Sequence, residues 1–135
     1  TQLTDNARDF KAQQNALAIE ARVRLLAGNI PSGELVMAHT RWDYGLPMHC
    51  RCFAVALSPG RGWHGLGYMT DRRNDVEEFF SDKTSGERRL ELMQEYSTQH
   101  VYTSLRLARM ILKSLPERAR ILASTNQGTV VFIDL

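Results

Sequence analysis

The sequence has few of the residues that would cross-link the chain or carry it through a membrane. Its 135 residues include only two cysteines and four prolines, and aromatic residues make up 8%. No stretch approaches the roughly 18 consecutive apolar residues that indicate a transmembrane helix. The first ten residues are polar and charged, without the apolar centre of a secretory signal. We therefore expect no membrane segment.

The two cysteines, Cys50 and Cys52, are separated by one residue. Cysteines that close together on an extended strand rarely meet the geometry of a disulfide. We therefore expect two free thiols, which are typical of a reducing compartment, and a cytoplasmic location.

The chain also lacks a large excess of either charge, because its formal net charge is only +2. A charge this small excludes a steering field over the whole molecule. Of the 17 basic residues, however, 14 are arginines, whose planar forks suit carboxylate and phosphate groups. The 43% of hydrophobic residues is enough for a packed interior, so we expect a single domain over residues 1–135.

Helical periodicity dominates the start of the chain and predicts a helix over residues 5–27, stopped by Gly28 and Pro31. One apolar stripe consists of Ala12, Ala16, Ile19, Val23 and Leu26. A second stripe consists of Leu3, Ala7, Phe10, Leu17 and Ala21. Since one stripe suffices to pack the helix on its own domain, the other predicts a homodimer formed through this helix.

Strand patterns follow over residues 34–42, 48–57 and 63–70, separated by turn sequences rich in glycine and proline. Two further strands are expected at 119–124 and 129–135. They flank Asn126-Gln127-Gly128, which we interpret as a three-residue hairpin loop with glycine in a left-handed conformation.

Between these groups of strands the pattern is helical. Residues 75–80 predict a short helix, and Thr84 with Glu87 predicts a capping box for a second one. Apolar residues at helical spacing continue from Leu90 to Leu115, and weak helix formers at 96–98 leave open one helix or two. The resulting fold class is α+β, in the order α-β-β-β-α-α-β-β. We expect a mainly antiparallel five-stranded sheet with long helices packed on one face.

Arginine and aromatic residues alternate through the predicted strand region. Aromatic rings on a sheet, flanked by guanidinium groups, can stack on bases and hold phosphates. This pattern predicts a binding module for nucleic acid or another anionic partner. The candidate site residues are Arg41, Arg51, Arg61, Trp63, His64, Tyr68 and Arg72.

Two other functions remain open. His39, His49 and His64, with a neighbouring carboxylate, could serve a small hydrolase or transferase, since histidine carries protons near neutral pH. Alternatively, the second stripe of the first helix could make the protein an adaptor for a protein partner. We expect no metal and no cofactor, because strand alternation sends His49 to the opposite face from Cys50 and Cys52.

Overall fold

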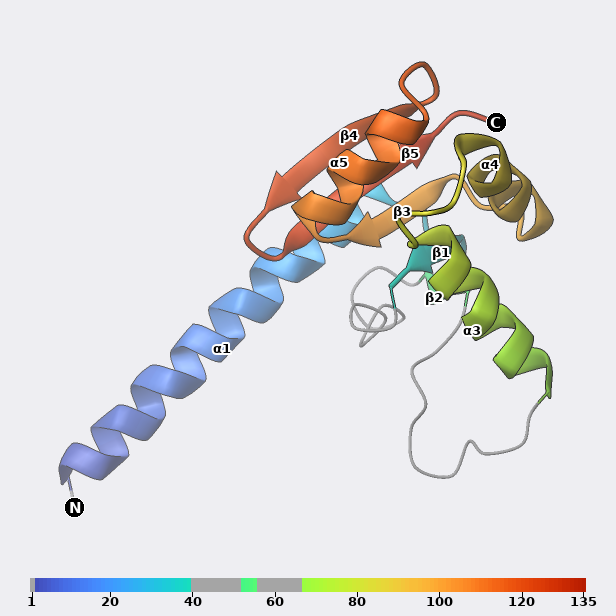
Figure 1. The fold of residues 1–135 in the computed structure, drawn as a ribbon. Coiled ribbons are helices and arrows are strands. Elements are labelled where there is room, and N and C mark those ends of the chain that lie inside the picture. The colour runs from blue at the N-terminus through green and yellow to red at the C-terminus, as the bar shows by residue number, and fades with distance from the viewer. Residues whose placement is uncertain (1, 40–51, 56–66) are drawn as a thin grey trace.

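The computed structural model describes residues 2–39, 52–55 and 67–135. Its helices are α1 (Gln2–Asn29), α3 (Gly67–Phe79), α4 (Gly86–Glu95) and α5 (Leu105–Ser114) (Figure 1). Its strands are β1 (Leu35–Ala38), β2 (Phe53–Ala54), β3 (His100–Thr103), β4 (Ala119–Thr125) and β5 (Gly128–Ile133). The α+β class is confirmed.

The five strands form one mixed sheet in the order β2-β1-β3-β5-β4. β1 pairs in parallel with β2 and with β3, whereas β5 runs antiparallel to both β3 and β4. The prediction of a mainly antiparallel sheet was therefore wrong. The parallel pairing arises from β3. This strand follows α3 and α4 in the chain, and the helical crossover lets it return beside β1 in the same direction, which a hairpin cannot do.

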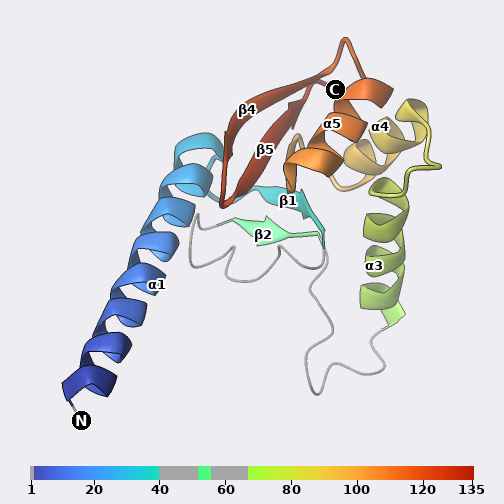
Figure 2. The same cartoon turned by 60° about the vertical axis from the view of Figure 1, so that its left-hand side comes forward.

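Helices cover both faces of this sheet, not one face as expected. Figure 2 shows α1 on one side and α3, α4 and α5 on the other. Along β3, the side chain of Tyr102 belongs to the cluster under α1, and that of Val101 belongs to the cluster under the other helices. Only α1 is long, with 28 residues, since α3, α4 and α5 have 10 to 13.

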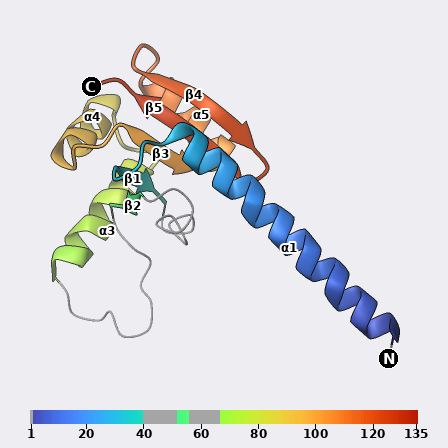
Figure 3. The ribbon, with the colours of Figure 1, turned by 180° about the vertical axis from the view of Figure 1, so that it is seen from behind.

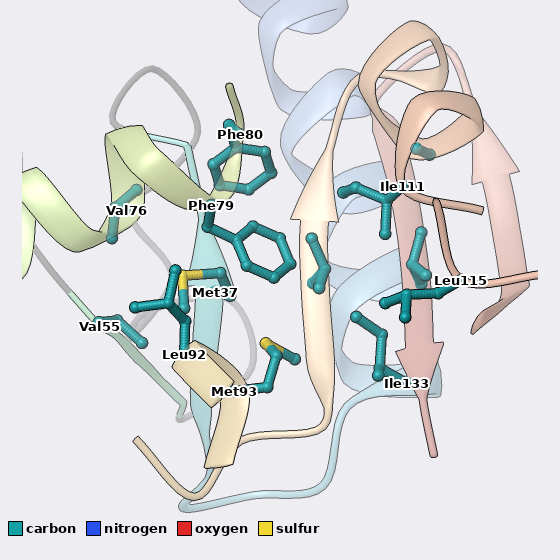
Figure 4. Packing of buried hydrophobic residues seen from close by; sticks show 13 residues of the cluster. Met37, Val55, Val76, Phe79, Phe80, Leu92, Met93, Ile111, Leu115 and Ile133 are labelled. Atoms are coloured by element: carbon teal, nitrogen blue, oxygen red, sulfur yellow. The ribbon is translucent and has the colours of Figure 1, made fainter. Parts of the chain in front are cut away.

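The larger buried cluster lies between the sheet and helices α3, α4 and α5 (Figure 4). It comprises Met37, Val55, Val76, Phe79, Phe80, Leu92, Met93, Val101, Ala108, Ile111, Leu115, Val131 and Ile133. Members come from strands β1, β3 and β5 and from all three helices, so this cluster packs the helices against the sheet.

The smaller cluster joins the end of α1 to the opposite face of the sheet. Leu25, Leu26 and Ile30 pack there against residues of β1, β3 and β5. In contrast, residues 6–17 are exposed, and this part of α1 projects away from the sheet (Figures 1 and 3). Only the last turns of the helix are thus held by the body of the protein.

Two sequence-based boundaries change in the middle of the chain. The strand expected over residues 63–70 is wrong for residues 67–70, because α3 begins at Gly67. Residues 63–66 lie outside the described residues. The run from Leu90 to Leu115 is two helices separated by β3. Apolar spacing misled here because all four residues of β3 are buried, so the strand shows no alternation.

The cap of α4 lies one residue later than the predicted capping box. The Ser85 side-chain oxygen accepts a hydrogen bond from the N–H of Arg88 at 3.2 Å. The hydroxyl of Thr84 instead donates to the carbonyl of Glu78, in the last turn of α3. Thr84 therefore ties α4 back to α3.

The hairpin of β4 and β5 is confirmed, but its loop is shorter than predicted. Thr125 pairs with Gly128, which leaves Asn126 and Gln127 as the turn. Gly128 has a φ of 133°, which residues with a side chain rarely adopt.

Cys52 is disulfide-bonded, so its prediction as a free thiol was wrong. It precedes β2, so the strand geometry on which that prediction rested does not apply to it. Cys50 lies outside the described residues. Within residues 2–39, 52–55 and 67–135, no helix is long and apolar enough to cross a membrane.

Candidate functional site

The carboxyl ends of β1 and β3 define a distinctive edge of the sheet. These strands are parallel neighbours, but the chain goes on from β1 to β2 on one side and from β3 through α5 to β4 on the other. Ligands of open α/β sheets bind at such switch points, because diverging connections leave a crevice outside the strand ends. His39 follows β1 at this edge, and Ser104 follows β3.

A hollow of about 480 Å³ opens between the end of α3 and the start of α5. One wall is formed by Phe80, Ser81 and Asp82, which follow α3. The other wall is formed by Arg106, Leu107 and Met110 of α5. The hollow lies at the switch-point edge, since α5 starts one residue after Ser104 and the ring of Phe80 is 5.4 Å from that of His39.

The amino end of α5 gives the hollow a positive side. Ser104 caps the helix, and its side-chain oxygen accepts from the N–H of Leu107 at 3.3 Å. The N–H groups of Leu105 and Arg106 have no acceptor in the described chain, as is usual for the first turn. Together with the helix dipole and the exposed Arg106 guanidinium, they favour an anion here.

The segment that leaves α3 is held by a buried arginine. Arg89 on α4 is 1% exposed and donates to the carbonyls of Phe79 and Ser81, at 2.8 and 2.6 Å. Its burial lowers the pKa of Arg89. The two hydrogen bonds fix the wall that carries Asp82.

A buried hydroxyl group near this edge lacks a hydrogen-bond partner among the described residues. Thr103, the last residue of β3, is fully buried, and its hydroxyl makes no hydrogen bond to any residue that the structure describes. Alternation along β3 places its side chain on the face covered by α3, α4 and α5, together with Val101. A buried hydroxyl without a partner costs stability, so its presence needs an explanation other than packing.

Most residues predicted from the sequence as the site are not described. Arg41, Arg51, Arg61, Trp63 and His64 lie outside the described residues.

The two predicted site residues that are described, Tyr68 and Arg72, are both in α3 and not on a strand. The Arg72 guanidinium donates to the carbonyl of Val55 at 3.2 Å and lies 5.6 Å from the ring centre of Tyr96. Arg72 therefore joins α3 to the end of β2 and to Tyr96.

The hollow itself was missed in the sequence. Arg106 and Asp82 are 24 residues apart, and no spacing rule joins them. The available signal was Ser104 followed by a strongly amphipathic helix, which marks a helix start after a buried strand.

The enzyme alternative is untested by this geometry. Of its three histidines only His39 is described, and His49 and His64 lie in the segments outside the structure. Within the described part of the chain there is no group of three or more His, Cys, Asp or Glu side chains that could hold a metal ion.

The chain matches no protein-family model, no curated protein and no solved structure.

Proposed function

We propose that this protein is a binding module for an anionic ligand, whose negative group is held where α5 begins. The observation that carries the proposal is the hollow beside Arg106, at the carboxyl ends of β1 and β3. Three features support an anionic ligand here. They are the amino end of α5, the Arg106 side chain, which has no ion-pair partner among the described residues, and the position at a switch point of the sheet.

The arginine-rich and aromatic segments support the same assignment through their place in the chain. Residues 40–51 begin directly after His39, which follows β1, and residues 56–66 begin directly after Val55, which follows β2. Both segments therefore start from the carboxyl ends of parallel strands. We propose that Arg41, Arg61, Trp63 and His64 extend the binding surface, and nucleic acid is one anionic ligand to be tested.

A titration of the intact protein with inorganic phosphate and with short single-stranded RNA and DNA tests the proposal. Binding should weaken as salt rises, because counterions are released. The Arg106→Gln variant should bind about tenfold more weakly. Arg109→Gln is the matched control, since Arg109 is exposed on the same helix but does not line the hollow. Absence of binding by all three ligands at low salt contradicts the proposal.

We also propose that two copies associate through α1. Phe10 and Leu17, both of the second stripe, are 63% and 65% exposed on the projecting part of this helix. Burying such side chains against a second copy would remove apolar surface from water. Light scattering after size exclusion should give a dimer mass that falls to the monomer mass in a Phe10→Ser, Leu17→Ser variant. A monomer mass for the unmodified protein contradicts this part.

A cytoplasmic location stays a prediction. It rested on two free thiols, and the disulfide at Cys52 removes that support.

A further inference from the structure

The two walls of the hollow beside α5 carry opposite charges. Asp82 lies on the wall that follows α3, and Arg106 lies on the wall formed by α5. Neither side chain forms an ion pair with any residue in the described ranges, and they do not pair with each other. Both charged groups are therefore available to a ligand that enters between them.

The backbone adds to the positive charge of the hollow and not to its negative charge. The first turn of α5 presents N–H groups beside Arg106, which adds to the positive side. At the end of α3 the carbonyls of Phe79 and Ser81 already accept hydrogen bonds from Arg89. The negative side of the hollow therefore depends mainly on the carboxylate of Asp82.

Apolar side chains line the same hollow as the two charged groups. Phe80 is 5% exposed, and Leu107 and Met110 are half-buried. Methionine adapts its shape to irregular apolar ligands, and the Phe80 ring packs edge to face on the ring of Phe79, with their centres 5.0 Å apart. The hollow therefore offers an apolar surface beside the two charged groups.

We propose that the ligand is a zwitterion with an apolar group, and specifically an α-amino acid with an apolar side chain. Its carboxylate binds Arg106 and the first turn of α5, its ammonium group binds Asp82, and its side chain packs on Phe80, Leu107 and Met110. This inference rests on the proposed function, since the carboxylate is the anionic group assigned there. A polyanion fits less well, because Asp82 repels it.

The test is an NMR titration of the intact protein with L-phenylalanine and two blocked derivatives. N-acetyl-L-phenylalanine lacks the ammonium group, and L-phenylalaninamide lacks the carboxylate. Each should bind about tenfold more weakly than L-phenylalanine, since each loses one charge-assisted contact. Glycine should also bind more weakly, because it has no side chain to bury.

Two variants assign the contacts. Asp82→Asn should remove the preference for L-phenylalanine over the N-acetyl derivative, and Arg106→Gln should remove the preference over the amide. Both positions carry exposed or rim side chains, so both variants should keep the circular dichroism spectrum of the parent protein. Arg109→Gln should leave every affinity unchanged.

The outcomes separate this inference from the proposed function. If N-acetyl-L-phenylalanine binds as tightly as L-phenylalanine, the anion site stands and the zwitterion inference is overturned. If inorganic phosphate or nucleic acid binds through Arg106 but L-phenylalanine does not, the inference again fails alone. If no anion binds in either experiment, both are overturned.

Discussion

The ring of Tyr102 on β3 lies against Gly128 at the start of β5, so closely that a Cβ atom at position 128 would overlap the ring. The phenol oxygen of Tyr102 donates to the carbonyl of Gln127 and accepts from Arg22 Nε at 3.2 Å. Tyr102 thereby joins the hairpin turn to α1. This contact requires glycine at position 128 for two reasons, the space and the positive φ.

Gly128→Ala should lower the free energy of unfolding by about 3 kcal/mol, because it adds an overlap to a strained backbone. Urea denaturation measures this change. Gly28→Ala is the control, since no atom lies within 4 Å of a Cβ there. It should be neutral or stabilise α1 by up to about 1 kcal/mol. Equal effects of the two substitutions would contradict the packing of Tyr102.

Neighbouring arginines on α4 should respond differently to the same substitution. Arg89→Met should cost about 3 kcal/mol, because the carbonyls of Phe79 and Ser81 lose a donor that is itself buried. Arg88→Met should change stability little, since Arg88 makes its ion pairs with Glu78 and Glu91 in solvent. Chemical denaturation of both variants measures the difference, and a larger loss for Arg88 would refute this assignment.

Two buried threonines should give effects of opposite sign. Thr103→Val should raise the free energy of unfolding by about 1 kcal/mol, because it removes a buried hydroxyl without a partner. Thr98→Val should lower it by about 1 kcal/mol, because the Thr98 hydroxyl donates to the carbonyl of Leu35 at 2.5 Å. Thermal and urea unfolding both report these changes. A destabilising Thr103→Val would show that its hydroxyl has a partner in solution.

Tyr96 should make stability depend on alkaline pH. Desolvation first, and then the hydrogen bond from its phenol to Asp75, raise the pKa of Tyr96 above its ordinary value of 10.0. The unfolded chain therefore loses this proton first, so the contribution is complete below pH 10 and falls as pH rises above it. Denaturation at pH 9 to 11 should show a smaller decline in Tyr96→Phe. An identical decline in both proteins would exclude this role.

Local signals were enough for α1 and for the β4–β5 hairpin, because helical stripes and a turn sequence act over a few residues. They failed for β3, since His100 to Thr103 are buried on both faces and Val101 also falls at a helical spacing from the apolar residues around it. Tyr68 was predicted on a strand over residues 63–70, but it belongs to the first turn of α3. A short stretch of this kind fits a strand as well as the start of a helix.

The hollow could not be predicted, because Asp82 and Arg106 meet only through tertiary packing. Asp82 is placed by the hydrogen bonds of Arg89. Arg106 is placed by the buried face of its own helix α5, which carries Ala108 and Ile111. Neither relation leaves a pattern in the sequence around the charged residue itself. The arginine content drew attention to residues 41–73, most of which lie outside the described residues, and not to Arg106.

The place of β5 in the sheet has a consequence for synthesis of the chain. β5 is made after β4, yet it lies between β3 and β4 and pairs with both. Until residues 128–133 have left the ribosome, those two strands have no common neighbour, and their facing backbone groups stay unpaired. A nascent chain arrested before Gly128 would therefore expose two open strand edges and should be prone to aggregate.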